Sequence, residues 1–152
     1  MALDLRIKYI FVLTFKMKIP IKISIIHAVM GLLTFVVFLQ TGWYMKTNEI
    51  GNLSDAQRMI YRAGHIYFLF SGLLNLSIGM QLQLSETTWK KTVQYLGSIL
   101  LLLSPLILLH GFYQEANLGQ IDRGMTSIGV FSSLAGMGLH TLIFLTGFLK
   151  KS

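Results

Sequence analysis

Four long apolar segments run along the chain, and short polar stretches separate them. A segment of about 20 apolar residues is long enough, as a helix, to cross the roughly 30 Å hydrocarbon core of a bilayer. The pattern therefore predicts transmembrane helices over residues 23–45, 63–81, 93–113 and 125–149. Charged residues, asparagine and glycine interrupt the three gaps, as expected of connections outside the membrane.

The three connections are short, so neighbouring helices are expected to run antiparallel. We therefore predict an all-α membrane protein in which a single domain, residues 1–152, forms an up-down-up-down bundle of four transmembrane helices. Ser54 followed by Gln57 is typical of a capping box, which places the start of the second helix outside the membrane.

The N-terminal residues 1–20 contain a short apolar stretch interrupted by Arg6 and Lys8, with no small-residue cleavage site. We expect an uncleaved segment that lies at the membrane interface rather than a signal peptide. Translation starts at Met1 or at Met17.

The basic residues are divided unequally between the two predicted sides of the membrane. Nine lysines and arginines fall on the side of both termini and four on the other side. Because cytoplasmic loops carry the excess of positive charge, both termini are expected in the cytoplasm of a bacterial inner (plasma) membrane. The net charge of +7 thus reflects topology, and the basic face suits anionic membrane lipid rather than nucleic acid.

One histidine lies in each predicted span: His27, His65, His110 and His140. At about 1.5 Å per helical residue, the alternating helices place His27 and His140 toward the cytoplasm and the other two toward the outer side. An ionisable side chain is costly in hydrocarbon, so two depth-matched pairs indicate a function.

Two opposed imidazoles in an apolar bundle are typical axial ligands of a b-type haem. We therefore predict two bis-histidine haems b, one between His27 and His140 and one between His65 and His110. The alternative for each histidine is a hydrogen bond between helices. Glycines on the histidine-bearing faces fit either a flat macrocycle or close helix packing.

Arg62 and Arg58 lie one and two turns before His65 on the same helical face. A guanidinium can bind a haem propionate bidentately, so Arg62, then Arg58 and Arg123, are candidate cofactor-binding residues. The alternative is that these arginines extend into interfacial water.

The predicted spans contain no aspartate or glutamate, and the chain has no cysteine. These absences exclude a carboxylate-bridged di-iron centre, iron–sulfur chemistry and the acid pair of a hydrolase. Haem, or a copper site built from histidine and methionine, remains among the metals.

A small four-helix membrane protein with two bis-histidine sites on opposite sides resembles the bacterial cytochrome b561 class, which includes the four-helix dihaem superoxide oxidases. The resemblance covers residues 23–149 and lies in architecture rather than in a sequence motif. In that class one helix contributes two histidines and another none, whereas this chain has one in every predicted span. The resemblance implies a dihaem membrane cytochrome and carries none of the family's quinone or superoxide residues to positions here.

We therefore expect an electron-transfer protein or membrane oxidoreductase that exchanges electrons with a membrane quinone or a small redox partner. Two alternatives stay open. The chain could be a non-enzymatic accessory or assembly subunit of a larger respiratory or redox complex. It could also be a metal or haem transporter, although the spans provide no clear polar path.

Overall fold

The computed structural model describes residues 20–48, 50–118 and 122–148, with one short turn and four long helices. The elements are α2 (Pro20–Thr47), η1 (Ile50–Asn52), α3 (Asp55–Gln81), α4 (Thr88–Leu118) and α5 (Gly124–Phe148). Each long helix is long and apolar enough to cross a membrane, so the prediction of an all-helical protein with four such segments is confirmed. The predicted interfacial segment, residues 1–20, lies outside the described residues except for Pro20.

Three of the helices extend beyond the apolar runs that predicted them. The start of α3 lies at Asp55 rather than at residue 63, and Ser54 caps it. The Ser54 hydroxyl accepts a hydrogen bond from Gln57 N at 3.3 Å, and Gln57 Oε1 accepts one from Ser54 N at 3.3 Å. The capping box read from the sequence is thus confirmed, and it adds two polar turns to the helix.

The extension of α4 brings a buried carboxylate into a candidate span, contrary to the prediction that the spans lack one. Glu115 Oε1 accepts hydrogen bonds from Met125 N at 2.7 Å and Thr126 N at 3.1 Å. These N–H groups belong to the first turn of α5 and have no partner within their own helix. Glu115 thus caps the start of α5. This cap needs α4 to continue as a helix past its apolar run, as far as the residue that supplies the carboxylate.

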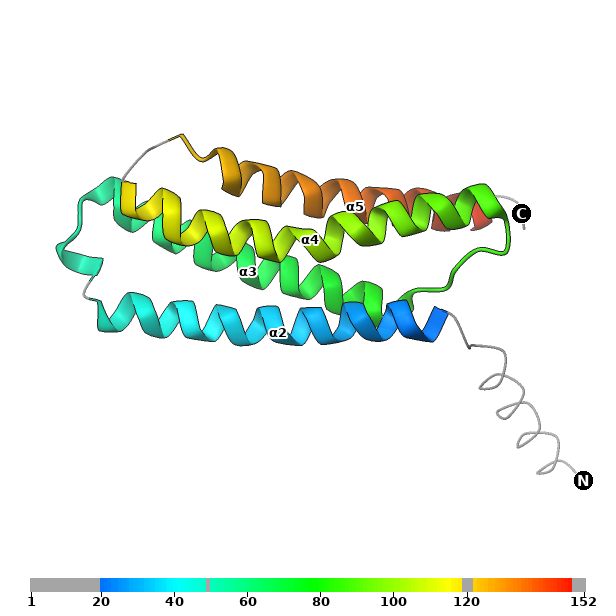
Figure 1. The fold of residues 1–152 in the computed structure, drawn as a ribbon, viewed down its shortest axis with the longest axis horizontal. Helices are drawn as coiled ribbons and strands as arrows, with labels where there is room; N and C mark the ends of the chain where they lie inside the picture. The colour runs from blue at the N-terminus through cyan, green and yellow to red at the C-terminus, as the bar shows by residue number, and fades with distance from the viewer. Residues whose placement is uncertain (1–19, 49, 119–121, 149–152) are drawn as a thin grey trace, which may run out of the picture.

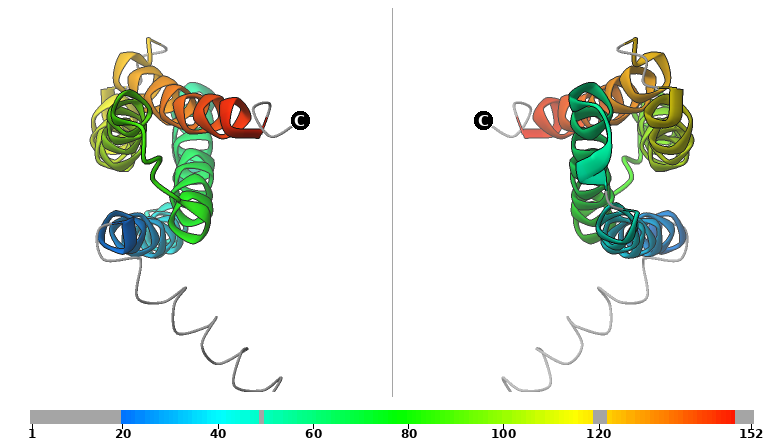
Figure 2. Two further views of the ribbon diagram at one scale, coloured as in Figure 1. Left: turned by 90° about the vertical axis from the view of Figure 1, so that its right-hand side faces the viewer. Right: turned by 90° about the vertical axis from the view of Figure 1, so that its left-hand side faces the viewer.

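The four helices form two closely packed pairs, α2 with α3 and α4 with α5. A looser contact between α3 and α4 joins the pairs, and α2 and α5 lie on opposite sides of the bundle (Figures 1 and 2). We call the part that contains the start of α2 and the end of α3 the Asn75 half, and the opposite part the Arg62 half.

Glycines bring the helices of each pair into backbone contact. A Cβ on Gly31 would lie 2.8 Å from Leu76 N, and one on Gly79 would lie 2.6 Å from Ala28 N, both across the α2–α3 contact. A Cβ on Gly136 would lie 2.7 Å from the carbonyl oxygen of Gly97, across the α4–α5 contact. The glycines at these positions therefore serve close helix packing, which was one of the two alternatives that the sequence analysis gave for them.

The core of the Arg62 half is aromatic. Tyr61, Phe68 and Phe112 are almost completely buried between α3 and α4, and Phe112 packs edge-on against Tyr61 with ring centroids 5.2 Å apart. The ring of Phe112 also lies against Gly64, where a Cβ would come within 2.9 Å of it. The space between α3 and α4 in this half is thus filled by protein side chains.

The α4–α5 contact predicts that substitution of Gly136 destabilises the protein more than substitution of the nearby Gly138. Gly136→Ala should lower the free energy of unfolding by about 1–3 kcal/mol relative to Gly138→Ala, because its methyl group would overlap the facing helix. A Cβ on Gly138 meets nothing within 4 Å. Thermal unfolding of both variants in the same detergent measures the difference, and equal midpoints would contradict the packing role of Gly136.

Candidate functional site

His27 lies on the first turns of α2 in the Asn75 half, with no exposed surface. Its Nδ1 is 2.8 Å from the side-chain oxygen of Asn75, on α3. Its other ring nitrogen, Nε2, is buried and has no hydrogen-bond partner among the described residues. A buried polar atom without a partner is costly, so this nitrogen marks a position where a ligand would restore an interaction.

The amide of Asn75 determines which nitrogen of His27 carries the proton. Its Nδ2 donates hydrogen bonds to the carbonyl oxygens of Ser71 and Leu101, each at 3.0 Å. The amide oxygen must therefore face His27, and an oxygen can only accept. Nδ1 of His27 is consequently the protonated donor, and Nε2 presents a free lone pair, as metal-ligating histidines require.

His140 approaches His27 from α5, the helix on the opposite side of the bundle. It is 6% exposed, and the two ring centroids are 6.3 Å apart with an interplanar angle of 87°. His140 Nε2 is 3.2 Å from the hydroxyl of Ser98 on α4. A hydroxyl can donate to an unprotonated Nε2, the same nitrogen that a metal would bind.

The spacing of the two rings agrees with that of two axial ligands on one metal. Metal–imidazole bonds are about 2 Å long, and a ring centre lies about 1 Å beyond its nitrogen, so opposed ligands place their centroids about 6 Å apart. The observed 6.3 Å matches this value. The same separation is usual for two rings in edge contact. The site thus brings two histidines together, of which His27 has a free Nε2 and His140 has its Nε2 bonded to Ser98.

A cavity of about 540 Å³ borders His140 between the end of α3, the start of α4 and α5. Met137, Phe144 and Ile78 provide apolar walls, and Lys90 lies at its polar end. Gln94 closes one side, because its amide bonds Gln83 O at 2.9 Å and accepts from Ser85 N at 2.8 Å. The volume is within the usual range of about 300–1,000 Å³ for small-molecule sites.

The other two histidines are not brought together. His65 is half-buried and faces α2, where its Nδ1 is 3.0 Å from the hydroxyl of Thr41 and its ring stacks on Phe38 with centroids 4.1 Å apart. His110 is exposed on α4. The pair His65 and His110 therefore stays a prediction.

The three candidate arginines lie in the Arg62 half. Arg58 forms an ion pair with Asp55 and donates to Gly51 O at 3.2 Å. Arg62 is exposed, and Arg123 lies over the ring of Tyr67, 5.4 Å from its centroid. Along α3, Arg62 is about 20 Å from Asn75, at 1.5 Å per residue. These arginines are thus remote from the site between His27 and His140.

Sequence reasoning found the histidines but not the groups that orient them. Beyond their polarity within apolar runs, the sequence carries no signal for Asn75, Ser98 or Gln94. No cluster of three or more histidines, aspartates or glutamates that could hold a metal ion occurs in the described part of the chain. His27 and His140 are the two candidate ligands that the structure brings together.

Comparison of the chain with protein-family models, curated proteins and solved structures found no match in any of the three.

The hydrogen bonds of Asn75 predict a loss of stability on its replacement. Asn75→Leu keeps the size of the side chain but leaves His27 Nδ1 without its acceptor and removes the bond between α3 and the Leu101 carbonyl, which keeps only that from Ser104. The expected cost is about 1–2 kcal/mol. Ser77→Ala is the control, because its hydroxyl bonds Leu73 O in its own helix at 2.8 Å. Thermal unfolding in detergent compares the two, and a loss no larger than that of the control would contradict the proposed role of the amide.

Proposed function

We propose that this chain is a b-type membrane cytochrome in which His27 and His140 are the axial ligands of a haem. The observation that supports this most directly is the buried Nε2 of His27, which lacks a partner and is held as a free lone pair by Asn75. The ring of His140 lies 6.3 Å from that of His27, so the two side chains would be the residues that hold the iron. Haem supplies the one-electron chemistry when bound.

The side chains around the pair have separate tasks in this proposal. Asn75 fixes the orientation and tautomer of His27, and Ser98 holds His140 in the bundle until a ligand replaces the hydroxyl. The buried apolar surroundings exclude water, and this low polarity is one means by which a protein sets a redox potential. The cavity beside His140 offers the position nearest to the site for a quinone or another small redox partner.

The proposal also includes the topology and the membrane orientation that the sequence predicts. We infer an antiparallel up-down-up-down bundle with both termini in the cytoplasm of a bacterial inner membrane, supported by the excess of lysine and arginine on the side of the termini. Membership in a class like the cytochromes b561 is part of this proposal. A second haem between His65 and His110 would require those two side chains to turn toward each other.

Optical spectroscopy tests the ligand assignment. Protein purified from haem-competent cells should show a Soret band and the sharp reduced bands of low-spin haem, and His27→Ala or His140→Ala should abolish the signal of this site. Thr141→Val is the matched control, because Thr141 follows His140 on α5 and bonds Met137 O in its own helix. His110→Ala reports on the second pair, since a loss of half the absorbance would reveal another haem.

A colourless wild-type protein, or unchanged spectra after substitution of both His27 and His140, would overturn the proposal. The hydrogen bonds of these histidines would then serve to join helices, as in an accessory subunit of a larger membrane complex.

Asn75 provides a second test of the same site. Asn75→Leu should weaken haem retention about 10- to 100-fold, because loss of a partner to the non-ligating nitrogen reduces the affinity of a metal-binding histidine. Ser71→Ala is the control, since its hydroxyl bonds Ser104 at 2.8 Å and does not contact the histidine. Haem transfer to an acceptor apoprotein measures retention, and equal transfer rates for the two variants would exclude a positioning role for Asn75.

A further inference from the structure

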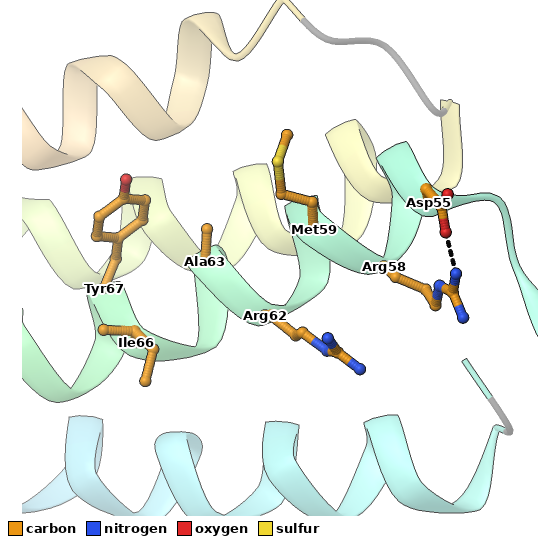
Figure 3. Close-up of a pocket in the computed structure, with 7 residues that line it drawn as sticks. All are labelled: Asp55, Arg58, Met59, Arg62, Ala63, Ile66 and Tyr67. Carbon is orange, nitrogen blue, oxygen red and sulfur yellow. Dashed lines mark hydrogen bonds and ion pairs between the residues drawn. The ribbon is translucent and has the colours of Figure 1, made fainter. Parts of the chain in front are cut away.

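A groove of about 620 Å³ follows one face of α3 in the Arg62 half. Seven residues between Asp55 and Tyr67 line it (Figure 3), and we call it the α3 groove. The groove is separate from the site at His27, because Arg62 and Asn75 are about 20 Å apart along the helix. A haem at His27 would therefore be too far away for its propionates to reach the cations of the α3 groove.

The polarity of the α3 groove changes along its length. Asp55, Arg58 and Arg62 lie near the start of α3, whereas Ala63 and Ile66 form an apolar surface farther along the candidate span. From first to last residue the groove extends about 18 Å at 1.5 Å per residue. A phospholipid has the same order of groups, with a charged headgroup at the water interface and acyl chains deeper in the membrane.

The charge of the α3 groove is not balanced by protein groups. Asp55 neutralises Arg58 through their ion pair, but Arg62 makes no hydrogen bond or ion pair among the described residues. Figure 3 shows Arg62 and Tyr67 pointing to opposite sides of the groove. The nearest buried carboxylate, Glu115, uses its oxygens to cap α5.

Arg123 adds a second unpaired guanidinium beside the groove. It lies over the ring of Tyr67, a residue that lines the groove, and its Nε and Nη2 are buried without a hydrogen-bond partner in the described part of the chain. A buried guanidinium without acceptors is costly, and a phosphate satisfies such donors with two parallel hydrogen bonds. The α3 groove thus has one unpaired cation, Arg62, toward its polar end and a second, Arg123, beside Tyr67 at its other end.

We propose that the α3 groove binds an anionic phospholipid, with its headgroup between Arg62 on one side and Arg123 on the other and an acyl chain along Ala63 and Ile66. The phosphate oxygens can accept from the buried donors of Arg123, and the single negative charge of the headgroup offsets part of the two unpaired positive charges. The apolar end of the groove distinguishes a lipid from a free phosphate ion, which has nothing to place there. The site depends on neither histidine pair.

Native mass spectrometry of the detergent-solubilised full chain tests this site with dioleoyl phosphatidylglycerol as the probe. Phosphatidylglycerol should bind at least fivefold more tightly than dioleoyl phosphatidylcholine, which has the same chains and no net charge. Arg62→Gln and Arg123→Gln should each weaken phosphatidylglycerol binding about five- to tenfold, as expected for the loss of one interfacial cation.

The matched control is Lys46→Gln, which removes a cation near Trp43 at the same end of the bundle but outside the α3 groove. It should leave phosphatidylglycerol binding within twofold of the wild type. His27→Ala should also leave it unchanged, so loss of haem and loss of lipid binding are separable results.

Four outcomes would overturn the proposal. These are equal affinity for the two lipids, unchanged binding in both arginine variants, an equal loss in Lys46→Gln, or full competition by inorganic phosphate at the concentration of the lipid. If an arginine variant fails to fold, the comparison of the two lipids on the wild-type chain still decides the result.

Discussion

The amide of Asn75 connects three helices at one point in the Asn75 half. Its nitrogen donates to a carbonyl oxygen of its own helix and to one of α4, and its oxygen accepts from His27 of α2. In hydrocarbon no water can replace these bonds, so each group must find its partner within the protein. This constraint places the ring of His27 in the core, fixes its tautomer and leaves its Nε2 buried without a partner.

The two halves of the bundle are built from different side chains, and their chemistry differs accordingly. The Arg62 half is filled by Tyr61, Phe68 and Phe112, whose rings pack against one another and against Gly64. The Asn75 half has polar groups at equivalent depth, with His27 and His140 among the buried residues. A close-packed aromatic core stabilises the fold but admits no cofactor, whereas a polar core with an unsatisfied nitrogen costs stability unless something binds there.

Hydropathy predicted the number of helices because each span must bury its backbone in hydrocarbon with apolar side chains. It did not predict their ends, since Glu115 and the residues after Ser54 continue helices through hydrogen bonds that an apolar pattern does not record. Helical rise gave the depth of each histidine, which was sufficient to place His27 beside His140. Depth does not determine rotation about the helix axis. His65 therefore faces α2 and His110 faces outward, although helical rise places the two histidines at matching depths.

The glycine contacts within the helix pairs have a mechanical consequence for the histidines. Backbone contact at Gly31 and Gly136 makes α2–α3 and α4–α5 two stiff hairpins, whereas the contact between the hairpins is looser. His27 belongs to one hairpin and His140 to the other, and hydrogen bonds between α3 and α4 already join the two hairpins. A ligand bound by both histidines would add a second link, this time between α2 and α5.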